Sequence, residues 1–502
     1  MEIKIIMNCL QKALHQCENC DKIRSLNEDR KDFEMKFRIL SMLLACLLLA
    51  LSASACSKKG TDPSDTSVEQ PTQDEPSEPK PEDTTDYEAV MRFQFEGLEE
   101  ASANDFSYEI ENGGVKVLSY TGEAEKVRIP AFIESLPVVA LGDRAFAGRT
   151  DLKVLYVPDG VSYFGKDILK DCTQLYALHT PFPLQENTSF LGYLYGAESY
   201  AMNNTAALRA LDYLEIGGSM TLLPSYALFD CNDLVVLKLP ETVRILGAYS
   251  LYRCESLKYV NTENLTDLEA HAMEFCASLE KLSFSQKLQR VGLGALENCT
   301  SLRRLTIPFV GESRTQNTFL GYVFGAENYG TAQGFYPTSL ENVTVTDGIS
   351  AIDSHAFYRC QTLQTVSLPT TVKSIGVRAF SGCSSLTAME LPDGLQKIGD
   401  AAFSGCEDLE IVIFGAQVSQ LGANCFLNCI RLKEIRLPDG LKVLPSSCFS
   451  GCKSLMVVSL GGVTTVGKNA FYGCDGLQSV ISSQSNVHFE DGNDPAKSLV
   501  DP

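Results

Sequence analysis

The feature that most constrains this chain is a cysteine that returns at a nearly constant interval. From residue 172 to residue 474, eleven cysteines in one recurring position are separated by 59, 23, 22, 23, 61, 23, 23, 23, 23 and 22 residues, and Arg149 lies 23 residues before the first. A fixed period of this size is typical of a solenoid, in which each repeat is one structural unit. The sequence therefore predicts a stack of short coils.

Each unit has the same pattern of small and apolar residues around its cysteine. A small residue and an apolar one precede the cysteine, as Ala356 and Phe357 do, and Leu363 follows it. Val366 and Leu368 then alternate with polar residues and a proline follows, which predicts a short strand that ends there. The A-F-x-x-C part has helical spacing and predicts a short helical or 3-10 turn. Because one unit cannot bury its apolar face alone, we expect an α/β solenoid with a parallel β-sheet on its concave face.

Two coils are longer than the others. The gaps of 59 and 61 residues each contain one regular unit of 23, which leaves long turns of 36 and 38 residues. The long turns resemble each other, since SFLGYLYGAESY at 189–200 matches TFLGYVFGAENY at 318–329. We expect each to leave the solenoid as a loop or hairpin with a small aromatic cluster.

These patterns together resemble a known family. The 23-residue unit, with L-x-x-V-x-L-P, I-G-x-x-A-F and a cysteine, is similar to the BspA-like class of bacterial leucine-rich repeats, as are the F-L-G-Y insert and the segment 106–146. The resemblance covers roughly residues 106–481. It implies a leucine-rich-repeat solenoid in a secreted or surface-exposed protein, and an association with adhesion to host proteins and other cells.

The N-terminal part has the layout of an export signal. Residues 35–56 read MKFRILSMLLACLLLALSASAC, with a short basic start, an apolar run of 13 residues and small residues before Cys56. The run is short for a membrane-spanning helix. The A-S-A-C end resembles a bacterial lipobox, although the family usually has Leu where Ala53 stands, and it implies lipidation of Cys56. The alternative is an ordinary cleaved signal that ends near a cysteine.

The chain then divides into six parts. We expect a non-native extension at 1–34, a signal peptide at 35–55, a disordered lipid-anchored tether at 56–88, an N-terminal cap at 89–140, the solenoid at 141–481 and a polar tail at 482–502. The tether is rich in Ser, Thr, Pro, Asp and Glu and has too few apolar residues to fold. This organisation places the solenoid on the extracellular face of the cell envelope, with the lipid as its only contact with the membrane.

The recurring cysteines have two interpretations. An exported protein often uses disulfides, but stacked side chains point in parallel and would hold neighbouring Cβ atoms farther apart than a disulfide prefers. We therefore expect a ladder of reduced cysteines that pack as small apolar residues. Cys425 and Cys448 form C-x-x-x-C pairs that suggest zinc, but both occupy the small-residue position before a Phe. We expect no metal site and no cofactor.

Composition and motifs argue against two functional classes. The formal net charge of −21 lacks the basic footprint that nucleic-acid binding needs. The sequence has no G-x-S-x-G, H-E-x-x-H, P-loop or dinucleotide-binding motif. We therefore expect neither an enzyme nor a nucleic-acid-binding protein.

The candidate ligand-binding residues occupy the variable positions of the predicted strands and of the two long turns. The strand positions form a strip that is basic over part of its length, which suggests an acidic partner or a charged glycan; the alternative is a solvated face whose charge drifts. Tyrosines of the long turns are the other candidates, because exposed Tyr often anchors interfaces, unless these turns only cover the solenoid edge. The candidates are Tyr156, Tyr176, His179, Lys238, Lys258, Tyr259, Lys281, Arg303, Arg304, Tyr195 and Tyr322.

Three functions are consistent with the predicted solenoid, export signal and candidate binding residues. The first is a lipid-anchored surface protein that binds proteins of a host or of neighbouring cells. The second is a lipoprotein that captures glycans, which the absence of Trp weakens. The third is a structural surface coat without a specific ligand.

Overall fold

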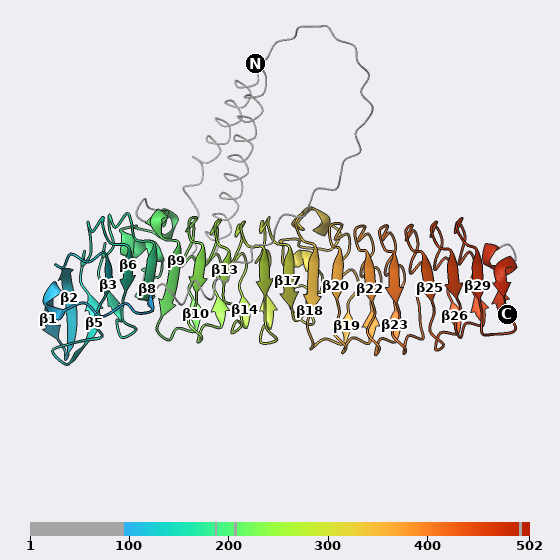
Figure 1. Ribbon diagram of the computed structural model, residues 1–502, viewed down its shortest axis with the longest axis horizontal. Helices are drawn as coiled ribbons and strands as arrows, with labels where there is room; N and C mark the ends of the chain where they lie inside the picture. Colours follow the sequence, from blue (N-terminus) through green and yellow to red (C-terminus); the bar gives the residue numbers. More distant parts are fainter. Residues whose placement is uncertain (1–94, 186–187, 205–207, 491–493, 502) are drawn as a thin grey trace, which may run out of the picture. The chain divides into compact units, whose positions relative to one another are not determined.

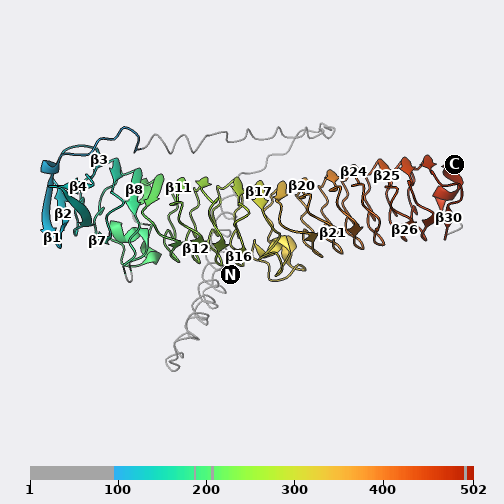
Figure 2. The same ribbon diagram turned by 90° about the horizontal axis from the view of Figure 1, so that it is seen from below.

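The computed structural model describes residues 95–185, 188–204, 208–490 and 494–501, which all belong to one compact unit, Thr84–Pro502. In this unit the chain winds into a row of stacked coils (Figure 1). Most coils contribute one strand to a first parallel ladder and a shorter strand to a second, and the two ladders run along opposite faces of the solenoid (Figure 2). The expected parallel solenoid is therefore confirmed. None of the helices in the described residues has the length and apolar character of a membrane span.

The first ladder is formed by the L-x-x-V-x-L segments. Its strands are β3 (Lys126–Arg128), β6 (Val154–Tyr156), β8 (Ala177–Pro181), β9 (Tyr213–Gly217), β11 (Val236–Lys238), β13 (Tyr259–Val260), β15 (Lys281–Ser283), β17 (Arg304–Ile307), β18 (Asn342–Val345), β20 (Thr365–Ser367), β22 (Ala388–Glu390), β24 (Ile411–Ile413), β25 (Glu434–Arg436), β27 (Val457–Ser459), β29 (Ser479–Ile481) and β31 (Val500–Asp501). In β20 the middle residue is buried and its two neighbours are exposed. The outer two residues of such a strand therefore form the surface of this face.

The second ladder is formed by short strands that end at the apolar residue before the recurring glycine, and the sequence analysis did not predict them. Its strands are β5 (Leu136–Leu141), β7 (Tyr163–Phe164), β10 (Leu222–Leu223), β12 (Ile245–Leu246), β14 (Asp267–Leu268), β16 (Arg290–Val291), β19 (Ala351–Ile352), β21 (Ser374–Ile375), β23 (Lys397–Ile398), β26 (Val443–Leu444), β28 (Thr465–Val466) and β30 (His488–Phe489). Glycine recurs here because the coils approach closely: a Cβ on Gly376 would lie 2.4 Å from the Ser354 nitrogen.

The two ends of the described unit differ from the regular coils. The first end begins with η1 (Ala103–Asp105) and an antiparallel pair, β1 (Phe106–Glu111) and β2 (Gly114–Tyr120). Strand β2 then pairs in parallel with β5, and β4 (Phe132–Ile133) pairs with β5 in the antiparallel direction. The last end carries η7 (Pro495–Leu499). The hairpin covers the first coil and gives the parallel stack a defined start.

The A-F-x-x-C segments correct one prediction, because they form non-helical turns. His355 and Arg359 both have left-handed backbone conformations, with φ of 64° and 58°. Such residues interrupt a right-handed helix. The Phe357 N–H between them donates to the Ala379 carbonyl of the next coil at 2.7 Å. The turns are therefore tied to their neighbours, and the named short helices of the solenoid are 3-10 turns.

The two long turns replace this segment in their own coils. The first contains η2 (Leu191–Tyr195), η3 (Tyr200–Met202) and η4 (Leu208–Ala210), and the second contains η5 (Leu320–Tyr322) and η6 (Ala332–Gly334). The Leu191 N–H donates to the Ala227 carbonyl, and the Leu169 N–H to the Leu194 carbonyl. Each F-L-G-Y segment thus fills the turn layer, and β8 still pairs with β9 and β17 with β18.

The core is a column of aromatic rings beside a column of cysteines. The rings of Phe380 and Phe403 are stacked with centroids 5.1 Å apart and planes 1° apart. The same stacking joins Phe357, Phe380, Phe403, Phe426, Phe449 and Phe471. All 13 cysteines of the described residues are buried free thiols, as expected of a packing ladder.

Candidate functional site

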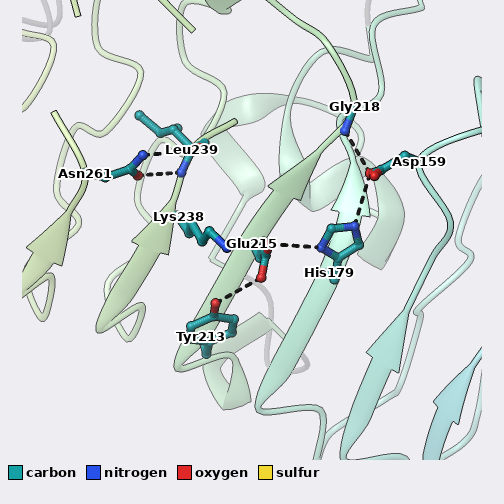
Figure 3. Close-up of polar contacts among 8 residues, drawn as sticks. All are labelled: Asp159, His179, Tyr213, Glu215, Gly218, Lys238, Leu239 and Asn261. Atoms are coloured by element: carbon teal, nitrogen blue, oxygen red, sulfur yellow. Dashed lines mark hydrogen bonds and ion pairs between the residues drawn. The ribbon is translucent and has the colours of Figure 1, made fainter. Parts of the chain in front are cut away.

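The outward face of the first ladder starts with a column of polar and aromatic side chains. Tyr156 and His179 stack with ring centroids 4.0 Å apart, and the Arg128 guanidinium lies 3.9 Å from the centre of the Tyr156 ring. His179 Nε2 lies 3.2 Å from Asp159 Oδ1, which also accepts the Gly218 N–H (Figure 3). These contacts tie neighbouring coils together across the ladder.

Glu215 continues this column and balances its positive charges. Its Oε1 atom lies 2.9 Å from Lys238 Nζ and 3.6 Å from His179 Nδ1, and its Oε2 atom accepts from the Tyr213 hydroxyl (Figure 3). Desolvation raises the pKa of Glu215, but the contacts with His179 and Lys238 outweigh it and lower the pKa to about 2. Lys238 is therefore already paired within the chain.

A segment that precedes the solenoid covers the first part of this face. The Phe95 ring is 8% exposed and lies 5.7 Å from the Tyr213 ring and 5.8 Å from the His179 ring, centre to centre. Phe95 forms a separate apolar cluster with the outward residues Val154, Ala177, Tyr213 and Val236. His179 is buried, and Tyr156 and Tyr176 are half-buried. These three candidates therefore offer little free surface.

The rest of the predicted basic strip is spread over β13, β15, β17 and the residues that precede them. Lys258, Lys281 and Arg304 are exposed, whereas Tyr259 is half-buried. Arg303 forms an ion pair with Glu341 at 3.0 Å. The strip thus carries acidic partners of its own, since Glu215 and Glu341 neutralise Lys238 and Arg303. Aligning the two long coils by their strands would have placed both glutamates in the strip.

The tyrosines of the long turns have separate positions. Tyr195 is 3% exposed, and its burial corrects its assignment as a surface contact. Tyr322 is half-buried and packs against a small cluster of Phe319, Ala326 and Ala332. Both long turns have an aromatic pair, Phe190 with Tyr193 in the first and Phe319 with Tyr322 in the second. The residues that follow in each turn, such as Leu194 and Val323, belong to the main core.

Strand β24 presents an apolar pair on the first face that the sequence analysis missed. Ile411 is 55% exposed and Ile413 is 56% exposed, and they occupy the two outward positions of this strand. Glu390, Glu434 and Arg436 on the adjacent strands surround the pair with exposed charges. Ile411 and Ile413 lie five and seven residues after Cys406, as Lys281 lies five residues after Cys276 and Lys238 seven after Cys231. Counting from the recurring cysteine would therefore have located both isoleucines. Exposed apolar residues rimmed by polar ones often mark interaction sites.

The buried cysteines have no features of reactive groups. Burial raises the pKa of the Cys383 thiol to about 12 and that of Cys299 to about 12. A thiol with so high a pKa stays protonated at neutral pH and is a poor nucleophile. Cys56, the expected lipidation site, lies outside the described residues, as do the predicted signal and tether.

The stacked coils, the ladder of Leu and the outward strand face define a leucine-rich-repeat protein. The chain belongs to the family described as "BspA type Leucine rich repeat region", whose model matches residues 84–191, 198–322, 331–456 and 373–492. Proteins of this family and fold are typically non-enzymatic binding scaffolds. No curated protein matches the chain.

Solved structures with similar folds include other bacterial leucine-rich-repeat proteins. A leucine-rich repeat protein from Bacteroides ovatus is 20% identical, covers 68% of this chain and 96% of its own, and has a TM-score of 0.32. A leucine rich cell surface protein from Faecalibacterium prausnitzii is 21% identical, covers 78% of this chain and 98% of its own, and has a TM-score of 0.30.

Proposed function

We propose that this chain is a cell-surface protein that binds protein partners through the outward face of its first ladder. Membership of the BspA-type family supports a binding role. The observation that carries the proposal is the exposed pair Ile411 and Ile413, because this apolar surface is surrounded by charged residues. Interfaces commonly combine such a centre with a polar rim.

The proposed attachment to the cell is a lipid on Cys56. The A-S-A-C end of the apolar segment and the acidic, proline-rich stretch after it support this attachment. The tether of residues 56–88 would then hold the solenoid away from the outer face of the cell envelope. Adhesion to host or neighbouring cells follows from the same arrangement, since the ladder face would be presented to them.

The glycan alternative has less support than a protein partner. A series of rings lies along the turn edge, where the half-buried Tyr226 stacks on the half-buried Tyr249 at 5.3 Å and Tyr249 on the buried His271 at 5.0 Å. Tyr249 is therefore covered by a ring on each of its two faces. These residues therefore present ring edges where a sugar would require an open ring face to stack on.

The binding proposal is tested with the purified full chain and surface-protein extracts of host and neighbouring cells. We expect the double substitution Ile411→Glu and Ile413→Glu to weaken capture of the retained partner at least about tenfold, as loss of a central apolar contact does. Val443→Glu on the opposite ladder is the matched control, because Val443 is also apolar and 53% exposed. Equal binding by both variants, or equal loss in both, would contradict the assigned face.

A further inference from the structure

The two long turns pack against equivalent places in the coils before them, so that their surroundings can be compared directly. The Leu169 N–H donates to the Leu194 carbonyl beside the first long turn, and the Leu296 N–H donates to the Val323 carbonyl beside the second. Counted from the recurring cysteine position, Arg144, Ala147, Asp167 and Lys170 in the first case correspond to His271, Glu274, Gly294 and Glu297 in the second.

The charges at these equivalent places differ. Beside the first long turn, Asp167 Oδ2 lies 3.8 Å from Arg144 Nη1 and 3.6 Å from Lys170 Nζ. A single carboxylate is there accompanied by two permanent cations. Beside the second long turn, the corresponding positions hold two carboxylates and one imidazole. Equivalent positions of the fold therefore hold an ion-pair cluster beside the first long turn and an imidazole with two carboxylates beside the second.

The second set brings three metal-ligating groups together. His271 Nδ1 lies 2.8 Å from Glu274 Oε2 and 3.7 Å from Glu297 Oε2. One ligand atom of each residue lies within 4.8 Å of the other two. The side chains are only 7%, 12% and 24% exposed, respectively. Two like charges held this close in a partly desolvated place repel each other, and a cation between them would offset the repulsion.

Two glycines pack so close to these ligand atoms that a side chain at either position would collide with them. A Cβ on Gly294 would lie 2.8 Å from both His271 Nδ1 and Glu297 Oε2, and a Cβ on Gly325 would lie 2.4 Å from Glu297 Oε2. The position of Gly294 carries a side chain in other coils, for example Arg378 and Asn424. Beside the second long turn that side chain is absent, and the His271 Nδ1 atom is buried behind the glycine backbone.

We infer that His271, Glu274 and Glu297 bind a divalent transition-metal ion of the zinc class. Imidazole and carboxylate together suit Zn²⁺, whereas Ca²⁺ takes six to eight oxygen ligands. Metal–ligand distances of about 2.0–2.2 Å in a tetrahedral site place ligand atoms about 3.3–3.6 Å apart. The distances of 2.8 and 3.7 Å lie on either side of this range. Three protein ligands leave the fourth position of a tetrahedral site to a water molecule.

The bound ion would connect two successive coils beside the second long turn. His271 and Glu274 come from the turn of one coil, and Glu297 comes from the turn of the next. This inference is independent of the partner-binding face, because the three residues lie in the turns and not on the first ladder.

The test is a zinc titration of the full chain after treatment with a chelator, in a buffer with a non-chelating reductant. We expect one Zn²⁺ per chain, and an affinity at least about tenfold lower in Glu297→Gln and in His271→Asn, since even outer-shell changes cost about that much. Asparagine is chosen because the position is left-handed and Asn424 and Asn469 occupy it elsewhere. Asp167→Asn beside the first long turn is the matched control and should bind as the unchanged chain does.

Cobalt substitution distinguishes this site from the 13 buried thiols. We expect Co²⁺ to give ligand-field bands without a thiolate-to-cobalt charge-transfer band, and these bands to disappear in Glu297→Gln. The absence of stoichiometric zinc binding, equal affinity in the ligand variants and the control, or a thiolate charge-transfer band would each overturn the inference.

Discussion

At the scale of single residues, the recurring cysteine position is explained by a hydrogen bond to the backbone of the preceding coil. The Cys406 thiol donates to the Phe380 carbonyl at 3.2 Å, and Cys429 does the same to Phe403. Arg149 occupies this position in the first coil and donates to the Gly122 and Ala124 carbonyls. In these coils the position supplies a donor to the backbone of the layer before it. A cysteine can supply this donor, because its buried thiol stays protonated.

The charge of Glu215 gives a prediction about acid stability. Its folded pKa of about 2 lies below the usual 4.5. Its contribution to stability is therefore present above about pH 4.5 and is lost as the pH falls towards 2, on the order of 3 kcal/mol in all. We expect Glu215→Gln to be less stable at pH 7 and to lose less stability between pH 5 and 2. Urea unfolding at a series of pH values measures this, and parallel curves for the two proteins would contradict it.

At the scale of elements, the sequence predicts what depends on local alternation and misses what depends on contacts between coils. The strands of the first ladder follow from the L-x-x-V-x-L pattern. The second ladder escaped prediction because strands of two residues, such as Ser374–Ile375, are too short to show a period. The turns were expected to be helical because the spacing of the residues around Phe357 fits a helix. The left-handed backbone conformations of His355 and Arg359 are not visible in that spacing.

The candidate site was predictable to a similar extent. Counting from the recurring cysteine identifies the outward positions, including Ile411 and Ile413. The cover by Phe95 was not predictable, because Phe95 reaches across the sequence to Val154, Tyr213 and Val236. The pairing of Arg303 with Glu341 was hidden for a related reason, since the second long turn separates these two residues in the sequence.

The column of phenylalanines predicts a local loss of stability when it is interrupted. Phe403 is fully buried between Phe380 and Phe426. We expect Phe403→Ala to cost about 3–5 kcal/mol, as for other buried phenylalanines. Because each coil contacts mainly its neighbours, hydrogen exchange should rise most in the adjacent coils. The control is Phe335→Ala at a residue 38% exposed, where little change is expected. A uniform rise along the whole solenoid would count against nearest-neighbour stacking.

At the scale of the whole molecule, the stack presents its strand positions as one long surface. The outward residues of the first ladder vary from coil to coil, from the covered Val154 to the exposed Ile413, while the inward ones stay apolar. The fold therefore allows the surface to change without loss of the core. The N-terminal segment covers the start of the face, which leaves the later strands as the accessible region. A preformed surface of this kind binds with little ordering cost.

The most direct test of the central claim is site-specific photocrosslinking on intact cells that display the full chain. A photoreactive residue is placed at Ile413 on the first ladder or at Val443 on the second, and the cells are mixed with host or neighbouring cells before illumination. We expect position 413 to crosslink to a discrete surface protein and position 443 to give no crosslink. Crosslinks from position 443 alone, or from neither position on cells that retain the partner, would contradict the assignment of the binding face.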